Sequence, residues 1–268
     1  MTGLRRALFV AGILLVCAWT LVPIYLVALG GIGGAATVYA WPKPFWPATL
    51  SLSNFQAFLE IEGIWPAMLR SIEVAVLCML FSLLLGAPAG YALARFAFRG
   101  ATIYRLTILM TRAFPVGILA LPLAVGFVRL GIYDTAFGVA LMHTALALPF
   151  AVLVTASLFL GIPRELEEAA WVFGCSGLGA FRRVVLPLAI PGIAATAIFA
   201  FVISWNEVFA ASVLTVRHKT LTAYLLTLLS EAPLQSQLAG GLLLILPSVL
   251  FIFLVRRYLF AMWGVASR

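Results

Sequence analysis

Long uncharged stretches are the feature that most constrains how this chain can fold. A bilayer has a hydrocarbon core of roughly 30 Å, which an apolar helix of about 20 residues can cross. Six stretches reach that length, the third interrupted only by Arg112, and they lie at residues 7–42, 74–94, 106–128, 135–163, 184–206 and 232–255. The pattern therefore predicts an all-α membrane protein with six transmembrane helices.

The composition excludes several other classes of protein. Of 268 residues, 64% are hydrophobic and 10% are charged, and the mean hydropathy is +1.14. An average soluble domain carries about 25% charged residues. A soluble enzyme, a disordered chain and a nucleic-acid-binding module are excluded, despite 17 Lys and Arg against 9 Asp and Glu. The three scattered cysteines fit neither a disulfide framework nor a metal site, so we expect no metal and no cofactor in this chain.

The positions of the basic residues predict the orientation. With the N-terminus inside the cell, eleven of the 17 Lys and Arg residues fall in cytoplasmic segments and five in outer segments. This asymmetry agrees with the positive-inside rule, so we expect both termini to be cytoplasmic. Arg5 and Arg6 precede the first span as in a signal peptide, but the apolar stretch exceeds the usual 7–15 residues, which favours an uncleaved anchor.

The loop between the fourth and fifth spans contains the most informative pattern. Glu165, Glu167 and Glu168 follow Pro163, an arrangement typical of the first turn of a helix. Glycines at 174, 177 and 179 then predict a bend, and a second helix is expected from Phe181. Trp171 and Phe173 suit a surface that docks another protein, whereas an acidic first turn is unfavourable on an anionic lipid surface.

Several motifs resemble binding-protein-dependent ABC importer permeases of the carbohydrate (maltose-type) family. Glu168-Ala169-Ala170 is followed by Gly174, Val184 and Leu186-Pro187 at the spacing of the EAA-x3-G-x9-I-x-LP motif, with Val in place of Ile. Ile162–Ala170 is similar to the lead-in of carbohydrate permeases, Ser204–Glu207 to their W-N-E/D element, and Tyr91–Phe96 to the end of their second helix. The C-terminal residues 259–265 depart from the family's usual tail.

The resemblance implies a type I ABC importer permease fold with a cytoplasmic EAA coupling helix. It implies three regions: a first helix and extracytoplasmic loop (1–66), a permease core with five helices (67–260, coupling loop 161–187) and a cytoplasmic tail (261–268). In this family the coupling helix docks in a cleft of an ATPase subunit. The residues expected to take part in ATPase coupling are Glu165, Glu167, Glu168, Ala169, Ala170, Phe173, Gly174, Leu186 and Pro187.

The resemblance also implies the partners. They are a second permease subunit in a heterodimer, two ATPase subunits, and an extracytoplasmic binding protein that delivers a sugar or sugar-like solute. The implied location is the bacterial-type inner membrane, with no nucleic-acid partner. The chain has no GxxxxGK[ST] loop, so ATP and Mg²⁺ are expected in the ATPase subunits and this chain is expected not to be an enzyme.

Four residues are candidates for the substrate pathway: His143, Trp205, Asn206 and Glu207. Polar groups at membrane depth are functional candidates. His143 fits either a lining residue or a hydrogen-bond donor to a neighbouring helix. Trp205 beside Asn206 and Glu207 suits a sugar, with its C–H faces and hydroxyls, but equally suits an interfacial Trp with an Asn that packs between helices.

Other functions stay open at this point. A non-sugar solute such as a polyol, a glycerol phosphate or a polyamine is compatible with the same permease features. An ion-coupled carrier would need no ATPase, and a membrane-embedded enzyme would need a cluster of acids, metal ligands or a nucleophile with its base. The predicted spans contain one His and isolated Glu residues, which disfavours the enzyme.

Overall fold

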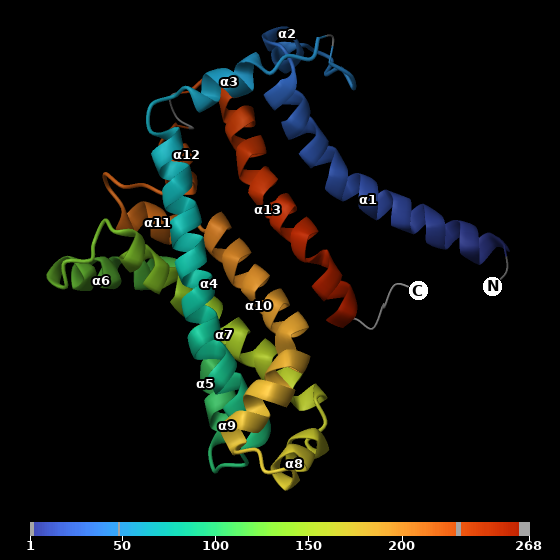
Figure 1. Ribbon diagram of the computed structural model, residues 1–268. Coiled ribbons are helices and arrows are strands. Elements are labelled where there is room, and N and C mark those ends of the chain that lie inside the picture. Colours follow the sequence, from blue (N-terminus) through green and yellow to red (C-terminus); the bar gives the residue numbers. More distant parts are fainter. Residues whose placement is uncertain (1–2, 48, 229–231, 263–268) are drawn as a thin grey trace. The chain divides into compact units, whose positions relative to one another are not determined.

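The computed structural model describes residues 3–47, 49–228 and 232–262 (Figure 1). It divides into two compact units, one formed by residues up to 65 together with 225–246, the other by 66–224 together with the residues from 247. All regular secondary-structure elements in the described ranges are helices, apart from one isolated β-bridge between Gly33 and Leu50. The elements are α1 (Gly3–Ile32), α2 (Ala35–Tyr39), α3 (Ser53–Leu59), α4 (Ile64–Arg95), α5 (Ala101–Thr111), α6 (Val116–Arg129), α7 (Ala136–Gly161), α8 (Glu165–Val172), α9 (Gly177–Ala180), the π-helical turn η1 (Phe181–Val185), α10 (Leu186–Asn206), α11 (Phe209–Leu214), α12 (Leu221–Leu228) and α13 (Leu234–Met262).

Five of the six predicted spans are long apolar helices, and the third is not a single straight helix. The five comprise α1, α4, α7, the continuous run from α9 to α10, and α13. The predicted span 106–128 consists instead of α5 and α6, which meet at 90°. Pro115 explains the break, because it lacks the N–H that would continue the helix and disfavours helical geometry at Phe114. Arg112, which interrupts the sequence pattern, is the C-cap of α5.

In the first unit, glycines bring helices into close contact. The backbone at Gly30 and Gly31 of α1 lies against Leu238 and Ala239 of α13. The remainder of α1 exposes its apolar side chains within this single chain, Trp19 among them. A helix that is apolar on all sides requires lipid or another subunit around it. The helix ends at Ile32, where the glycine cluster of residues 30–34 lies.

In the second unit, α4 packs on α7 through small residues. A Cβ at Gly86 would lie 2.8 Å from Ala151, and a Cβ at Gly90 would lie 2.1 Å from the hydroxyl of Thr155. The Thr155 hydroxyl donates a hydrogen bond of 3.0 Å to the Gly86 carbonyl. Small residues at such positions let helix backbones approach closely, as membrane helices do. The same contact holds α4 beside the part of α7 that leads into α8.

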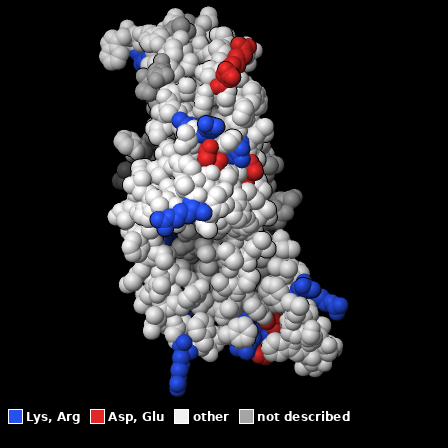
Figure 2. Space-filling view, turned by 90° about the vertical axis from the view of Figure 1, so that its left-hand side faces the viewer, with Lys and Arg blue, Asp and Glu red and all other residues white. Residues whose placement is uncertain are grey.

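The surface is that of a membrane protein. Much of the face seen in Figure 2 carries no Lys, Arg, Asp or Glu, and large apolar side chains such as Leu84 and Ile118 are exposed. Arg70 and Glu73 form the surface ion pair that their i,i+3 spacing suggests, at 3.2 Å. The predicted tail, 261–268, lies almost wholly outside the described residues, since α13 is described to Met262.

Candidate functional site

The segment between α7 and α10 has the predicted helix–bend–helix form. α8 follows the end of α7 after a short turn, and Gly174 adopts φ +85°, a left-handed conformation that glycine adopts without strain. The second helix begins earlier than expected, at Gly177 rather than Phe181, because the Ser176 hydroxyl accepts a hydrogen bond from the Gly179 N–H and caps α9. Ser176 was the sequence signal for this start.

Large apolar side chains are exposed along α8 and at its C-cap, Phe173. Val172 is 85% exposed and Phe173 is 88% exposed. The Glu168 side chain is 54% exposed and lies 3.5 Å from Arg164. A patch of this kind marks a protein contact or a membrane contact. We call the patch formed by Leu166, Glu168, Trp171, Val172 and Phe173 the exposed face of α8.

The other predicted coupling residues have varied surroundings. Glu165, Ala169 and Pro187 are exposed, while Ala170 and Leu186 are half-buried. Glu167 differs from its neighbours in the same turn, because it is buried. Its carboxylate is bound by Arg95 and Tyr91 of α4. The resemblance to carbohydrate permeases includes the Tyr91–Phe96 segment but implies no role for Tyr91 or Arg95.

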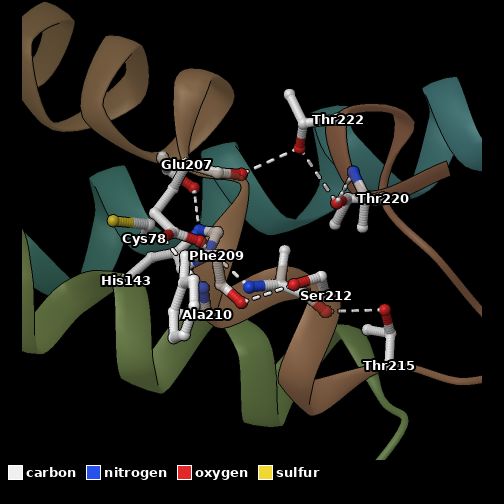
Figure 3. Close-up of polar contacts among 12 residues, drawn as sticks. Cys78, His143, Glu207, Phe209, Ala210, Ser212, Thr215, Thr220 and Thr222 are labelled. Atoms are coloured by element: carbon white, nitrogen blue, oxygen red, sulfur yellow. Dashed lines mark hydrogen bonds and ion pairs between the residues drawn. The ribbon is translucent and has the colours of Figure 1, made fainter. Parts of the chain in front are cut away.

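A second polar cluster joins α7 to the end of α10 (Figure 3). His143 is completely buried. Its Nδ1 lies 2.8 Å from the Ser204 hydroxyl, and its Nε2 lies 3.2 Å from the Glu207 carboxylate. In the tautomer whose Nε2–H donates to Glu207, Nδ1 accepts a hydrogen bond from the Ser204 hydroxyl. His143 therefore hydrogen-bonds the neighbouring helix α10, which is one of the two roles that the sequence left open.

Glu207 also organises the next helix. Its carboxylate oxygens accept hydrogen bonds from the N–H groups of Ala210 and Ala211, at 2.9 and 3.0 Å, at the start of α11. Its carbonyl accepts a hydrogen bond from the Thr222 hydroxyl at 2.8 Å (Figure 3). One residue thus fixes the junction between α10, α11 and α12.

The order Ser204–His143–Glu207 has the polarity of a hydrolase triad, in which a base lies between a hydroxyl and a carboxylate. Ser204 is only 4% exposed and His143 is 0% exposed, so the hydroxyl faces packed side chains instead of an open cleft. In the described parts of the chain, no group of three or more His, Cys, Asp or Glu could hold a metal. The hydrogen bonds of the cluster join α7 to the end of α10 and to the start of α11.

The other two pathway candidates lie at the same helix end but in different environments. Trp205 is buried and stacks on Phe201, with ring centroids 6.0 Å apart. Asn206 is exposed, and its amide nitrogen donates a hydrogen bond of 2.9 Å to the Val202 carbonyl. Of the four candidates, Asn206 is thus the most accessible in this chain.

Replacing His143 by alanine is expected to lower the stability of the chain. The change removes hydrogen bonds to Ser204 and Glu207 and leaves a cavity, so the free energy of unfolding should fall by about 2–4 kcal/mol. Thermal unfolding in detergent measures this. Ser204→Ala, which removes one partner, should have a smaller effect. Unchanged stability with an altered dependence of transport on solute would contradict the packing role and favour a lining role.

Asp134 links the loop before α7 to the loop after α11. Its carboxylate accepts hydrogen bonds from the N–H groups of Val216, Arg217 and His218 at 2.8–3.3 Å. The His218 ring lies 3.1 Å from the same carboxylate. Asp134 itself has a positive φ of 59°, an uncommon conformation that these contacts hold. Burial raises the pKa of Asp134, but the hydrogen bonds from Val216, His218 and Arg217 outweigh it, and the net pKa lies below 3.8.

Replacing Asp134 by asparagine is expected to destabilise the chain by about 2 kcal/mol at neutral pH, because the amide nitrogen would face backbone donors. A carboxyl whose pKa is lowered by folding stabilises the folded state in full when the pH is above its ordinary pKa, here 3.8. This stabilisation is lost as the pH falls through the pKa of the folded protein. The difference between the two proteins should therefore shrink at an acidic pH below 3.8. Thermal unfolding at both pH values measures it, and a pH-independent difference would contradict the role.

Comparison with known proteins identifies the family. Residues 82–262 match the family described as binding-protein-dependent transport system inner membrane component. The chain is 29% identical over 266 residues to the trehalose transport system permease protein SugB of Mycobacterium tuberculosis, covering 97% of this chain and 96% of that one. It is 34% identical over 223 residues to the arabinooligosaccharides transport system permease protein AraQ of Halalkalibacterium halodurans, and the match covers 81% of this chain and 79% of that one.

A solved structure has the same fold. A chain from a bacterial ABC transporter involved in the import of the acidic polysaccharide alginate superposes with a TM-score of 0.74 at 22% identity, covering 96% of this chain and 98% of that one. The predicted permease fold is therefore confirmed. The helix–bend–helix segment at 161–187 and four of the five long apolar helices lie wholly or partly within the matched residues, and α1 precedes them. The chain belongs to the family of inner membrane components of binding-protein-dependent transport systems, and is a multi-pass permease subunit of an ABC importer.

Proposed function

We propose that this permease translocates a sugar or sugar-like solute. Its relatives include permeases named for trehalose and for arabino-oligosaccharides, and Ser204–Glu207 resembles the W-N-E/D element of carbohydrate permeases. Asn206 is the member of this element that is exposed. An amide can both donate to and accept from sugar hydroxyls, so Asn206 contacts the solute while His143, Trp205 and Glu207 hold its helix in place.

ATP-driven coupling through α8 is the second part of the proposal, and the exposed face of α8 is the observation that carries it. Apolar side chains as exposed as Val172 and Phe173, next to acids and inside the family's matched region, suit a cleft on a separate protein. The ATPase subunits hold ATP and Mg²⁺ and supply the energy. They bind α8 from the cytoplasm, which agrees with the positive-inside orientation and with cytoplasmic termini.

The proposed assembly contains this chain, a second permease subunit, two ATPase subunits and a binding protein. The apolar surface of α1 suits lipid or the second permease. The binding protein delivers solute to the outer segments 41–66 and 214–237. Closure of the ATPase subunits on ATP moves α8, and the helix bundle alternates between inward-open and outward-open states as rigid bodies.

A solute panel tests the sugar proposal. The purified binding protein from the same transport system is titrated calorimetrically with trehalose, arabino-oligosaccharides, diacetylchitobiose, glycerol phosphate and spermidine. Each loaded form is then added to proteoliposomes that contain the full transporter, and ATP hydrolysis is measured. We expect a sugar to bind and to stimulate hydrolysis. Stimulation by glycerol phosphate or spermidine alone would contradict the proposal and favour the non-sugar alternatives.

A further inference from the structure

Glu167 is the inward-facing acid of α8. Its side chain is 3% exposed, whereas that of Glu168, the next residue, is 54% exposed. One carboxylate oxygen accepts a hydrogen bond from the Arg95 guanidinium, and the other accepts one of 2.7 Å from the Tyr91 hydroxyl. An ATPase subunit therefore cannot be the direct partner of this carboxylate in the arrangement seen here.

Arg95 holds more than the carboxylate. Its side chain is 7% exposed, and its Nη2 donates a hydrogen bond of 3.0 Å to the carbonyl of Ile162, in the turn between α7 and α8. The guanidinium is planar and carries several donors in a fixed geometry. A single side chain at the end of α4 thus fixes both α8 and the backbone that enters it.

Aromatic rings surround this polar cluster. Tyr91 lies edge-on to Phe159 of α7 and to Phe181 of η1, with ring centroids 5.3 and 4.7 Å apart. Phe159 and Val185 are fully buried beside them. The ion pair is therefore shielded from water, and removing one partner would leave the other as an uncompensated buried charge, which is strongly unfavourable.

We propose that Tyr91, Arg95 and Glu167 are positioning residues that make α8 and the adjoining end of α4 move as one rigid unit. This inference rests on the proposed function, because it concerns how a displacement of α8 by the ATPase reaches the membrane-spanning helices. Tyr91 and Arg95 are four residues apart on one face of α4, so a force on α8 is applied directly to that helix. In the assembled transporter, the distance between α8 and α4 stays fixed while both move.

Spin-label distances in the assembled transporter test this inference. One label is placed on Cys175, which follows α8, and the other on α4 in a Leu84→Cys variant, where the side chain is exposed. Cys17 is replaced by serine, and the buried Cys78 stays unlabelled. Pulsed electron resonance compares the nucleotide-free complex with the complex trapped by ATP and vanadate. With Tyr91, Arg95 and Glu167 intact, we expect the same distance distribution in both states.

In the isosteric Glu167→Gln variant we expect trapping to shift or broaden that distribution by several Å, because the charge that binds Arg95 is gone. Tyr91→Phe, which removes one hydroxyl and is the milder change, should have a smaller effect of the same kind. Glu73→Gln, at an exposed ion pair on the same helix, is the matched control and should behave like the unaltered protein. A distance that changes on trapping in the unaltered protein, or stays constant in both Glu167→Gln and Tyr91→Phe, would overturn the proposal.

Recovery of the ATPase subunit with each labelled variant keeps this test separate from the proposed function. If the unaltered chain copurifies with no ATPase, the proposed function fails. If the ATPase is retained and the distances respond as described, the rigid connection is supported. If Glu167→Gln loses the ATPase while Tyr91→Phe retains it with unchanged distances, the connection is refuted and Glu167 serves docking instead.

Discussion

Replacing Glu168 by lysine should release the ATPase subunit from this permease and abolish ATP-driven transport, while membrane insertion continues. Glu168 lies exposed in the first turn of α8, 3.5 Å from Arg164. Lysine would repel Arg164, oppose the partial positive charge at the helix N-terminus and reverse the charge within the exposed face of α8. Like charges juxtaposed at an interface cost several kcal/mol, so the affinity for the ATPase should fall about 100-fold or more.

Copurification of the ATPase with the tagged permease in detergent measures this loss, and the amount of permease in the membrane fraction measures insertion. Glu73→Lys reverses an acid of similar exposure, in an ion pair at the other end of α4, and should retain the ATPase. If Glu168→Lys retained the ATPase and full transport, α8 would have no role in docking.

A valine in place of Gly174 should have a comparable effect for a different reason. Gly174 has φ +85°, yet a Cβ there would meet no atom within 4 Å. The penalty is therefore backbone strain alone, which for a β-branched residue in this region is about 1–3 kcal/mol. We expect the chain to relieve the strain by rotating α8 relative to α9, which misplaces the exposed face of α8 and weakens ATPase binding.

Gly174→Asn tests whether strain is the cause, because asparagine tolerates the left-handed conformation and should restore most of the binding. Gly161→Val is the matched control: no atom lies within 4 Å of its Cβ position and its φ is not positive. ATPase copurification again provides the measurement. Equal loss with valine and asparagine at position 174 would contradict the strain mechanism.

The bilayer explains why so much of the fold could be predicted from charge spacing alone. A charge at membrane depth is costly, so uncharged stretches give the positions of helices directly, as they do for α1, α4, α7, α10 and α13. The exception, α5 and α6, arises where Pro115 breaks hydrogen bonding within an otherwise apolar stretch. Composition is insensitive to such a break, since an apolar chain with a bend has the same hydropathy as one without.

The candidate site was predictable only where its determinants are local. Acids, glycines and prolines placed the helix–bend–helix segment within a few residues, because capping and turn preferences act over short distances. The partners of Glu167 and His143 are distant in sequence: Arg95 is 72 residues from Glu167, and Ser204 is 61 from His143. Which side of a helix faces its neighbour depends on packing, and neither spacing nor hydropathy specifies it when the helix is apolar on all sides.

The central claim is that the exposed face of α8 is the surface on which a separate ATPase acts. The most direct measurement places a photo-crosslinking amino acid at Phe173, which is exposed, in cells that express the complete transporter. Irradiation followed by mass spectrometry of the crosslinked product identifies the neighbour. We predict a crosslink to the subunit that hydrolyses ATP. Crosslinks to lipid alone, or to the extracytoplasmic binding protein, would contradict the account.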